Sequence, residues 1–194
     1  MKLFFYLATK NKNKVKEIKE IMGKNFEILS PPDFIEFPEE NGKTLYENAY
    51  LKAEYLSKFF KDFYIVSEDS GLFVEKLNGL PGVNSARFSG ERDDIKNIKK
   101  LLDMMKEYKN KEDRKAKFIA VVCLIGKGEK KFFEGEIEGY ITFEPKGNNG
   151  FGYDPVFEVP EIGKTFAELT LEEKNKISHR TKAFLKLKEY LEKR

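Results

Sequence analysis

The chain has 194 residues, 40% of them hydrophobic, which is enough for one domain that buries most of the surface its unfolded form would expose. Its 36 basic and 33 acidic residues leave a formal net charge of only +3. This balance argues against a dedicated nucleic-acid-binding protein, because such proteins carry a large basic excess on one face. We therefore expect a single domain over residues 1–194 and no nucleic-acid partner.

The cysteine count and the amino-terminal segment indicate the cellular compartment in which the protein is expected to lie. Cys123 is the only cysteine, so neither a disulfide framework nor a cysteine metal site can form within the chain. The apolar run over residues 3–8 is too short for a membrane span and is followed by polar and basic residues. We expect a cytoplasmic protein that has no membrane partner.

Hydrophobic periodicity predicts a strand, a helix and a second strand at the start of the chain. The apolar run over 3–8 is typical of a buried strand, and after a polar loop the apolar residues recur at helical spacing over 14–22. A short strand over 25–29 ends at two prolines, which lack the amide donor that a sheet needs. An acidic loop over 36–42 follows.

Helices and strands continue to alternate in the next segments. Thr44 and Glu47 have the spacing of a capping box, which predicts a helix reaching about Phe60. A third strand over 63–67 is expected to end abruptly at Glu68, and a further helix is predicted around 95–105.

The second half favours long antiparallel strands. Residues 116–125 and 131–143 are the longest strand candidates, with a glycine-containing hairpin tip between them, and Gly135 and Gly139 are interpreted as bends. After a glycine-rich loop over 145–155, Thr170 begins a second capping box and Ser178 begins a terminal helix. The fold class predicted is α/β, a mixed sheet with helices on its faces.

Two polar clusters in the first half are candidates for chemistry. Thr9, Asn11 and Lys14 lie between a strand and a helix start, where amides, a hydroxyl and an ammonium can converge on an anion, although a lysine-rich helix start is more often simply solvated. Glu68 and Asp69 lie at the predicted strand end, where they could be ordinary surface acids at a turn. In a regular strand their side chains would point apart, whereas a turn of the backbone at Gly71 could bring both to one site. A third carboxylate from the acidic loop would complete an oxygen set that suits Mg²⁺.

Two further clusters lie near the carboxyl end. The segment Gly150-Phe151-Gly152-Tyr153-Asp154-Pro155 could hold aromatic rings and a carboxylate against a flat base, or could be a hairpin with core aromatics. The segment Ser178-His179-Arg180 contains the only histidine, and its arginine opposes the dipole of the predicted helix, which suggests that it serves a partner.

Five motifs taken together resemble the inosine triphosphate pyrophosphatase family, which removes non-canonical purine nucleoside triphosphates. They are Thr9-x-Asn11-x-x-Lys14, Glu68-Asp69-Ser70-Gly71, Leu80-Pro81-Gly82-Val83 with Ser85-Ala86-Arg87, Gly150-Phe151-Gly152-Tyr153-Asp154-Pro155, and Glu173-Lys174 with Ile177-Ser178-His179-Arg180. The resemblance runs from Leu3 to the terminal helix. It implies an elongated mixed sheet flanked by helices, two lobes with a central active-site cleft, a homodimer, and hydrolysis of inosine, deoxyinosine or xanthosine triphosphate to the monophosphate and pyrophosphate.

The resemblance also assigns roles to individual residues. Asp69 is expected to be the general base, and Glu39, Glu68 and Asp69 the Mg²⁺ ligands, with the choice between Glu39 and Glu40 left open. The residues expected to bind the substrate are Thr9, Lys10, Asn11, Lys12, Asn13, Lys14, Lys52, Ser70, Phe151, Gly152, Tyr153, Asp154, Lys174, His179 and Arg180. Lys10 departs from the family, in which many relatives have glycine, and this leaves the conformation of the first loop open.

Two other classes of function share some of these features. A nucleotide-binding or RNA-associated module without catalytic activity would share the phosphate loop and the aromatics, but acids beside phosphates are of use only with a metal between them. The related Maf-type pyrophosphatases act on pyrimidine nucleotides. The segments at Phe151 and at Ser178 favour a purine instead.

Overall fold

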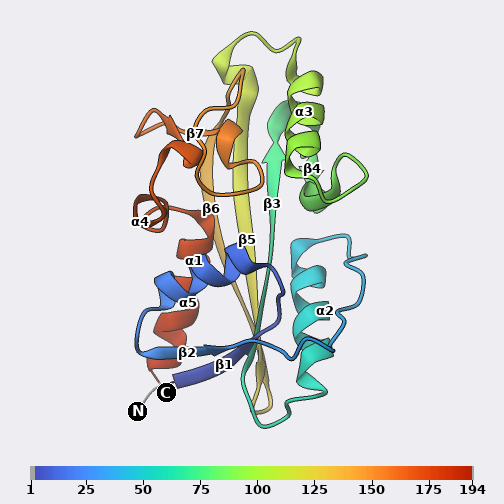
Figure 1. Cartoon of the computed structure of the whole chain (residues 1–194), viewed down its shortest axis with the longest axis vertical. Coiled ribbons are helices and arrows are strands. Elements are labelled where there is room, and N and C mark those ends of the chain that lie inside the picture. Colours follow the sequence, from blue (N-terminus) through green and yellow to red (C-terminus); the bar gives the residue numbers. More distant parts are fainter. Residues whose placement is uncertain (1–2, 194) are drawn as a thin grey trace. The chain divides into compact units, whose positions relative to one another are not determined.

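The computed structural model describes residues 3–193 and divides into two compact units (Figure 1). The first unit comprises the described part of Met1–Asp69 together with Ala120–Gly135 and His179–Arg194, and the second comprises Ser70–Ile119 and Glu136–Ser178. The chain passes between the units at four points, of which three lie within strands and the fourth lies directly before the terminal helix. The prediction of a single domain is neither confirmed nor contradicted by this division.

The sheet is mixed, as predicted, and its strand order is β2-β1-β3-β5-β6-β7-β8, with β4 paired to β3. The strands are β1 (Leu3–Leu7), β2 (Phe26–Leu29), β3 (Ile65–Val74), β4 (Pro81–Gly82), β5 (Lys115–Gly126), β6 (Glu129–Ile141), β7 (Phe157–Val159) and β8 (Lys164–Thr165). Strand β1 is parallel to both β2 and β3, whereas β7 is antiparallel to β6 and β8. The early helical crossovers account for the parallel pairs.

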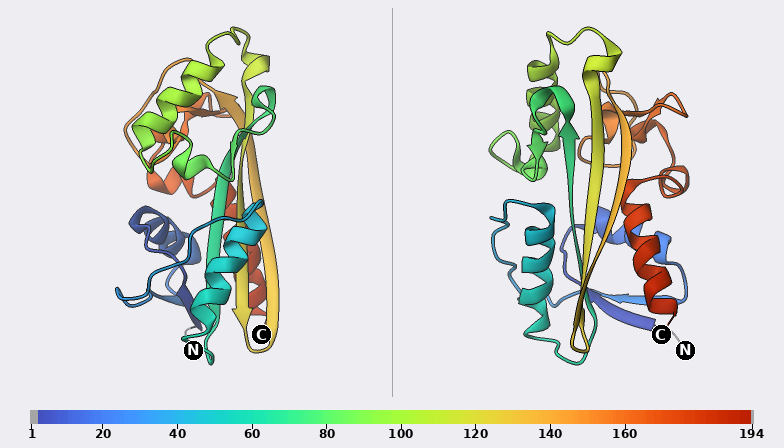
Figure 2. Two further views of the ribbon diagram at one scale, coloured as in Figure 1. Left: turned by 90° about the vertical axis from the view of Figure 1, so that its right-hand side faces the viewer. Right: turned by 180° about the vertical axis from the view of Figure 1, so that it is seen from behind.

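Five α-helices are present among the described residues: α1 (Lys12–Met22), α2 (Leu45–Ser57), α3 (Asp94–Met105), α4 (Leu171–Lys174) and α5 (His179–Glu192). Within the first unit α5 packs against α1 (Figure 2). None of the described helices is long and apolar enough to cross a membrane.

Side-chain caps explain where these helices begin. The capping box at Thr170 and Glu173 is present in both directions. At α2 only half of the predicted box forms: the Thr44 hydroxyl accepts from the Glu47 amide at 3.1 Å, but the Glu47 carboxylate accepts from the Lys43 amide at 2.6 Å instead. The predicted helix was also too long, since α2 ends at Ser57.

Each unit has its own apolar core. The first contains Phe5, Leu7, Ile18, Met22, Phe26, Val66, Ala120, Val122, Leu124, Phe184 and Leu187, and the second contains Leu72, Val74, Ile98, Leu101, Phe118, Ile141, Phe157 and Phe166. The even-numbered residues of β5 enter these cores because side chains alternate along a strand.

Strand β3 does not end at Glu68, so that prediction was wrong. It continues to Val74, because Gly71 lies against β4: a Cβ at Gly71 would lie 2.4 Å from the carbonyl oxygen of Gly82. Gly71 therefore permits a close approach between strands rather than a turn.

Gly135 and Gly139 are likewise not bends, since β6 runs through both without interruption. A Cβ at Gly135 would lie 2.2 Å from the carbonyl oxygen of His179, and one at Gly139 would lie 2.4 Å from that of Glu158. Both glycines let neighbouring backbone approach β6 more closely than any side chain would allow.

Candidate active site

The loop between β1 and α1 is organised by the two polar side chains that the sequence singled out. The Thr9 hydroxyl accepts from the Asn11 amide at 3.1 Å, and the Asn11 side-chain oxygen accepts from the backbone amides of Asn13 and Lys14 at 3.0 and 3.1 Å. Asn11 is thus the N-cap of α1. Because these contacts use only acceptor atoms, the hydroxyl and the side-chain NH₂ keep their hydrogens for an anion.

The basic residues of this loop differ in placement. The Lys10 ammonium donates to the carbonyl oxygen of Asp33 at 2.9 Å, so it is tied to the following loop. Lys12 and Asn13 are exposed at the helix start. The Lys14 ammonium turns inward and lies 2.8 Å from a carboxylate oxygen of Glu68.

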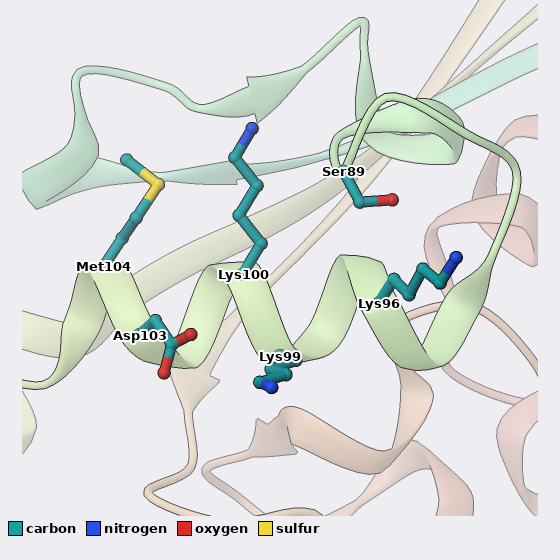
Figure 3. A pocket seen from close by; sticks show the side chains of 6 residues that line it. All are labelled: Ser89, Lys96, Lys99, Lys100, Asp103 and Met104. Carbon is teal, nitrogen blue, oxygen red and sulfur yellow. The ribbon is translucent and has the colours of Figure 1, made fainter.

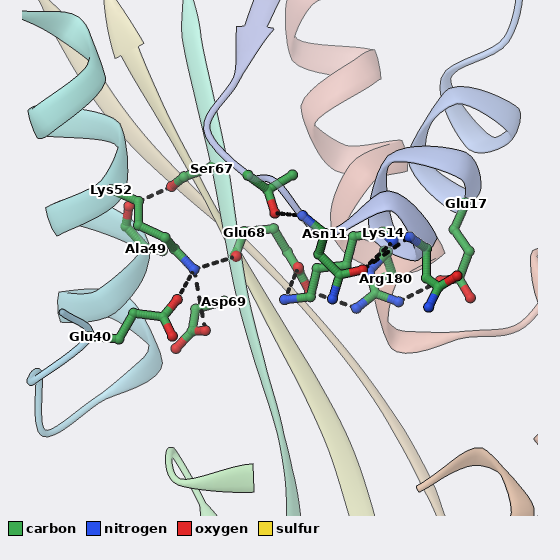
Figure 4. A network of polar contacts seen from close by, with 12 residues as sticks. Asn11, Lys14, Glu17, Glu40, Ala49, Lys52, Ser67, Glu68, Asp69 and Arg180 are labelled. Carbon is green, nitrogen blue, oxygen red and sulfur yellow. Dashed lines mark hydrogen bonds and ion pairs between the residues drawn. The ribbon is translucent and has the colours of Figure 1, made fainter. Parts of the chain in front are cut away.

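Glu68 and Asp69 are both buried on β3 and point in different directions (Figure 4). Glu68 meets Lys14 and also accepts from the Arg180 guanidinium at 3.1 Å. Asp69 lies on the α2 side, with one carboxylate oxygen 3.5 Å from the ammonium of Lys52. Because the strand stays regular through this pair, its alternation separates the two side chains.

The two carboxyls differ in acidity as a result. Burial opposes ionisation of Glu68, but Arg180 and Lys14 together outweigh it and hold the pKa of Glu68 below its ordinary value. Burial raises the pKa of Asp69 above its ordinary value, although Lys52 and Lys14 act in the opposite direction. Neighbouring carboxyls whose pKa values are pushed apart suit one permanently ionised group and one proton acceptor.

Lys52 lies among oxygen atoms. Its ammonium is 2.6 Å from a carboxylate oxygen of Glu40, 3.0 Å from the backbone carbonyl of Glu68 and 3.5 Å from Asp69. Burial would lower the pKa of Lys52, but Asp69 and Glu40 raise it above the ordinary value. Glu39 is exposed on the same loop, so of the two acids that the sequence left open it is Glu40 that reaches the cluster.

The donor chemistry of this cluster fits Mg²⁺, although the carboxylates do not converge. Among the described residues no group of three or more histidine, cysteine, aspartate or glutamate side chains lies close enough to hold a metal. However, the second carboxylate oxygen of Asp69 is buried and accepts no hydrogen bond from any described residue. The oxygens of Glu40, Asp69 and the Glu68 backbone already surround one cation, the Lys52 ammonium, and oxygen donors are what Mg²⁺ prefers.

At the start of α5, Arg180 is only 2% exposed and is held between two acids. Its guanidinium pairs with the carboxylates of Glu17 and Glu68. Glu17 was missed in the sequence, although it stands beside Ile18 on the buried stripe of α1 and three residues after Lys14, where an acid requires a partner. His179 is also buried. The expected roles of Arg180 and His179 in recognising the nucleobase stay predictions.

In the second unit, Asp154 and Lys174 form a buried ion pair of 2.6 Å. The same Asp154 oxygen accepts from the Phe151 amide at 3.0 Å, and the Lys174 ammonium lies 5.0 Å from the centre of the Phe151 ring. Gly150 is required here, because a Cβ at this position would lie 2.0 Å from that carboxylate oxygen. The pair therefore fixes the backbone that carries the half-buried Phe151 ring.

The next two residues brace this loop. The Tyr153 ring lies in the core of the second unit, and its hydroxyl donates to the carbonyl oxygen of Ser85 at 2.7 Å, while burial raises the pKa of that hydroxyl. The Gly152 amide donates to the Asp94 carboxylate at 2.8 Å. Of the predicted aromatic pair only Phe151 keeps a partly exposed ring. Ser70, the remaining predicted contact, is half-buried on β3.

A hollow of about 410 Å³ lies on the exposed face of α3 (Figure 3). Its lining residues are Ser89, Lys96, Lys99, Lys100, Asp103 and Met104. The Lys96 ammonium pairs with Glu91 at 2.7 Å and that of Lys100 donates to the Phe88 carbonyl at 2.7 Å. Since none of the predicted site residues lines it, we do not assign the chemistry to this hollow.

Comparison with known proteins gives matches over nearly the whole chain. The model of the Ham1 family matches residues 5–190. The dITP/XTP pyrophosphatase of Caldanaerobacter subterraneus subsp. tengcongensis is 51% identical over 193 residues, covering 97% of this chain and 96% of that protein. The dITP/XTP pyrophosphatase of Bacillus subtilis is 47% identical, covering 96% of each.

Solved structures agree. The Ham1 protein of Staphylococcus aureus has a TM-score of 0.84 and 39% identity, covering 97% of this chain and 98% of its own. A HAM1 protein from Coxiella burnetii has a TM-score of 0.88 and 35% identity, covering 99% of this chain and 100% of its own.

Proposed function

The chain belongs to the Ham1 family, and from this premise we propose that it hydrolyses non-canonical purine nucleoside triphosphates such as dITP, ITP and XTP to the monophosphate and pyrophosphate. The relatives named dITP/XTP pyrophosphatase are about half identical to it over nearly its full length. The structural observation that carries the proposal is the pair of buried carboxyls on β3 flanked by Lys14 and Lys52. Such a set offers cations for phosphates and a carboxylate for water.

In this proposal the first unit binds the triphosphate. Thr9 and Asn11 donate to phosphate oxygens from the start of α1, and Lys14 and Lys52 supply the positive charge that the pyrophosphate leaving group needs. Glu40, Asp69 and the backbone carbonyl of Glu68 would hold Mg²⁺, with Glu40 taking the place first given to Glu39, while the Glu68 carboxylate, first expected to be a ligand, stays paired with Lys14 and Arg180. Bound Mg²⁺ supplies further neutralisation of phosphate charge.

Asp69 is proposed as the general base. Its raised pKa favours accepting a proton from the water that attacks the α-phosphorus, and the bond to the pyrophosphate oxygen breaks in the same reaction. Glu68 remains ionised throughout because its pKa is held low. The electrostatic difference between the two acids supports these separate roles.

The loop around Phe151 is proposed to contact the nucleobase. The Phe151 ring provides a stacking surface, and Asp154 and Lys174 fix its backbone. The family resemblance further leads us to propose a homodimer and a cytoplasmic location.

The test is a substrate panel with product identification. Purified protein with Mg²⁺ should convert dITP, ITP and XTP to monophosphate and pyrophosphate far faster than ATP, GTP or any pyrimidine triphosphate. Release of orthophosphate and a diphosphate would show that a different bond is cut. Preference for a pyrimidine triphosphate would instead favour the activity of the Maf-type enzymes.

A further inference from the structure

The acidic loop that carries Glu40 is anchored to α2 by a buried asparagine. Asn48 is 1% exposed, and its side-chain oxygen accepts from the backbone amide of Gly42 at 2.8 Å. A buried side-chain acceptor that pairs with a loop amide fixes that part of the loop, because breaking the contact would leave a polar group without a partner.

The absence of a side chain at Gly42 allows this contact. A Cβ at Gly42 would lie 2.6 Å from the Asn48 side-chain oxygen and 2.8 Å from the Cβ of Glu47. The loop backbone therefore lies directly on the first turn of α2, at a distance that only glycine permits.

The anchored backbone leads straight to Glu40. Asn48 and Lys52 are four residues apart and so share one face of α2. Asn48 holds the loop at Gly42, and two residues earlier the Glu40 carboxylate reaches Lys52 at 2.6 Å. The same helical face therefore fixes both the backbone and the carboxylate of the loop.

We infer that Asn48 is a positioning residue that holds Glu40 in place for a divalent cation. Asn48 does not itself touch the cation or the substrate. Its contribution is preorganisation: without it Glu40 must be ordered at the moment of binding, and the cation binds less tightly. This inference rests on the proposed function only in taking Glu40 as a cation ligand.

The test measures cation affinity directly, without turnover. Binding of Mn²⁺, a paramagnetic stand-in for Mg²⁺, is followed by electron paramagnetic resonance in the absence of nucleotide. Asn48→Ala and Gly42→Ala break the same contact from opposite sides, and each should raise the dissociation constant about three- to tenfold, the effect of one hydrogen bond. The double variant should bind no more weakly than the weaker single variant, because both changes remove one interaction.

Asn97→Ala is the matched control. Asn97 is also 1% exposed, lies in the first turn of α3, and accepts from the Ser89 amide of the preceding loop at 2.7 Å. Because its side-chain NH₂ also donates to the Ala86 carbonyl at 3.1 Å, its loss should lower stability by at least as much as that of Asn48 and leave the Mn²⁺ affinity unchanged. If Asn48→Ala fails to fold, Gly42→Ala still tests the inference, since it changes no residue of α2 itself.

Three outcomes are decisive. Weaker Mn²⁺ binding in Asn48→Ala and Gly42→Ala, with wild-type binding in Asn97→Ala, supports the inference. Wild-type binding in Gly42→Ala and Asn48→Ala, while Glu40→Gln binds weakly, overturns it and leaves the proposed function intact. Failure of the wild-type protein to hydrolyse dITP overturns the proposed function independently of these affinities.

Discussion

Replacing Arg180 by methionine should destabilise the protein strongly at neutral pH. The guanidinium is 2% exposed and pairs with Glu17 and Glu68, whose side chains are 3% and 1% exposed. Removing one partner of a buried ion pair typically costs about 3–5 kcal/mol, because the remaining charge stays buried. For a chain of this length each kcal/mol lowers Tm by about 2–4 °C, so we expect a fall of about 6–20 °C.

The loss of unfolding free energy caused by Arg180→Met should be smaller at acidic pH than at neutral pH. The folded-state pKa of Glu68 is depressed, so its pairing contributes stability above the ordinary glutamate pKa of about 4.3 and loses it as the pH falls. In Arg180→Met the buried carboxyl takes up a proton more readily, which removes the uncompensated charge. The difference in unfolding free energy between wild type and variant should therefore be smaller at pH 4 than at pH 7.

Urea denaturation of both proteins at the two pH values measures this difference. Glu189→Gln is the control on the same helix, since it breaks an exposed pair with Lys193 whose side chains are 68% and 71% exposed. That change should leave the free energy of unfolding almost unchanged, because water screens the two exposed charges. A different result would contradict this reasoning: Arg180→Met is as stable as the control, and its turnover of dITP falls while that of ATP does not. Arg180 would then serve mainly to recognise the nucleobase, and its ion pairs with Glu17 and Glu68 would contribute little to stability.

Three further predictions concern the proposed general base, Asp69, and the glycines Gly135 and Gly150. The raised pKa of Asp69 predicts that kcat/KM for dITP falls on acidification at a higher pH than an exposed aspartate would give, and a pH profile checks this. Gly135→Ala should lower the unfolding free energy by about 3 kcal/mol or more, because its Cβ would lie 2.2 Å from the His179 carbonyl oxygen, and thermal denaturation measures it. Gly150→Ala should raise KM for dITP at least about tenfold by displacing the Asp154 carboxylate, and unchanged KM would show that the loop does not bind substrate.

Local rules predicted much of the fold. The capping box at Thr170 was identified in the sequence and marks where α4 begins, whereas the cap at Asn11 was not predicted and α1 begins at Lys12, before the expected start at Lys14. Long apolar alternation predicted β5 and β6. The errors at Gly71 and Gly135 have a non-local cause: each glycine accommodates the backbone of another segment, which no local pattern specifies.

The site was predicted in part for a similar reason. The residue types around Lys14, Lys52 and the β3 acids were identified from the sequence, and the structure brings Lys14 to Glu68 and Lys52 to Asp69. Glu17 was missed because its partner Arg180 lies 163 residues away. Tyr153 looked like a base contact because an aromatic in a glycine-rich loop resembles a ligand platform until its burial is known.

The opposite perturbation of the two β3 acids follows from strand geometry alone. Adjacent residues on a strand face opposite sides, so Glu68 pairs with Lys14 and Arg180 while Asp69 lies near Lys52. Burial outweighs the attraction of the nearby lysines at Asp69 and raises its pKa. A turn at Gly71 would have placed both carboxylates in one environment, where mutual repulsion would have coupled their titration. Regular strand pairing separates the two side chains and so reduces this repulsion, although the charge of Glu68 still contributes to the raised pKa of Asp69. The continuous backbone through Gly71 therefore allows two neighbouring acids to differ in protonation behaviour at the same pH.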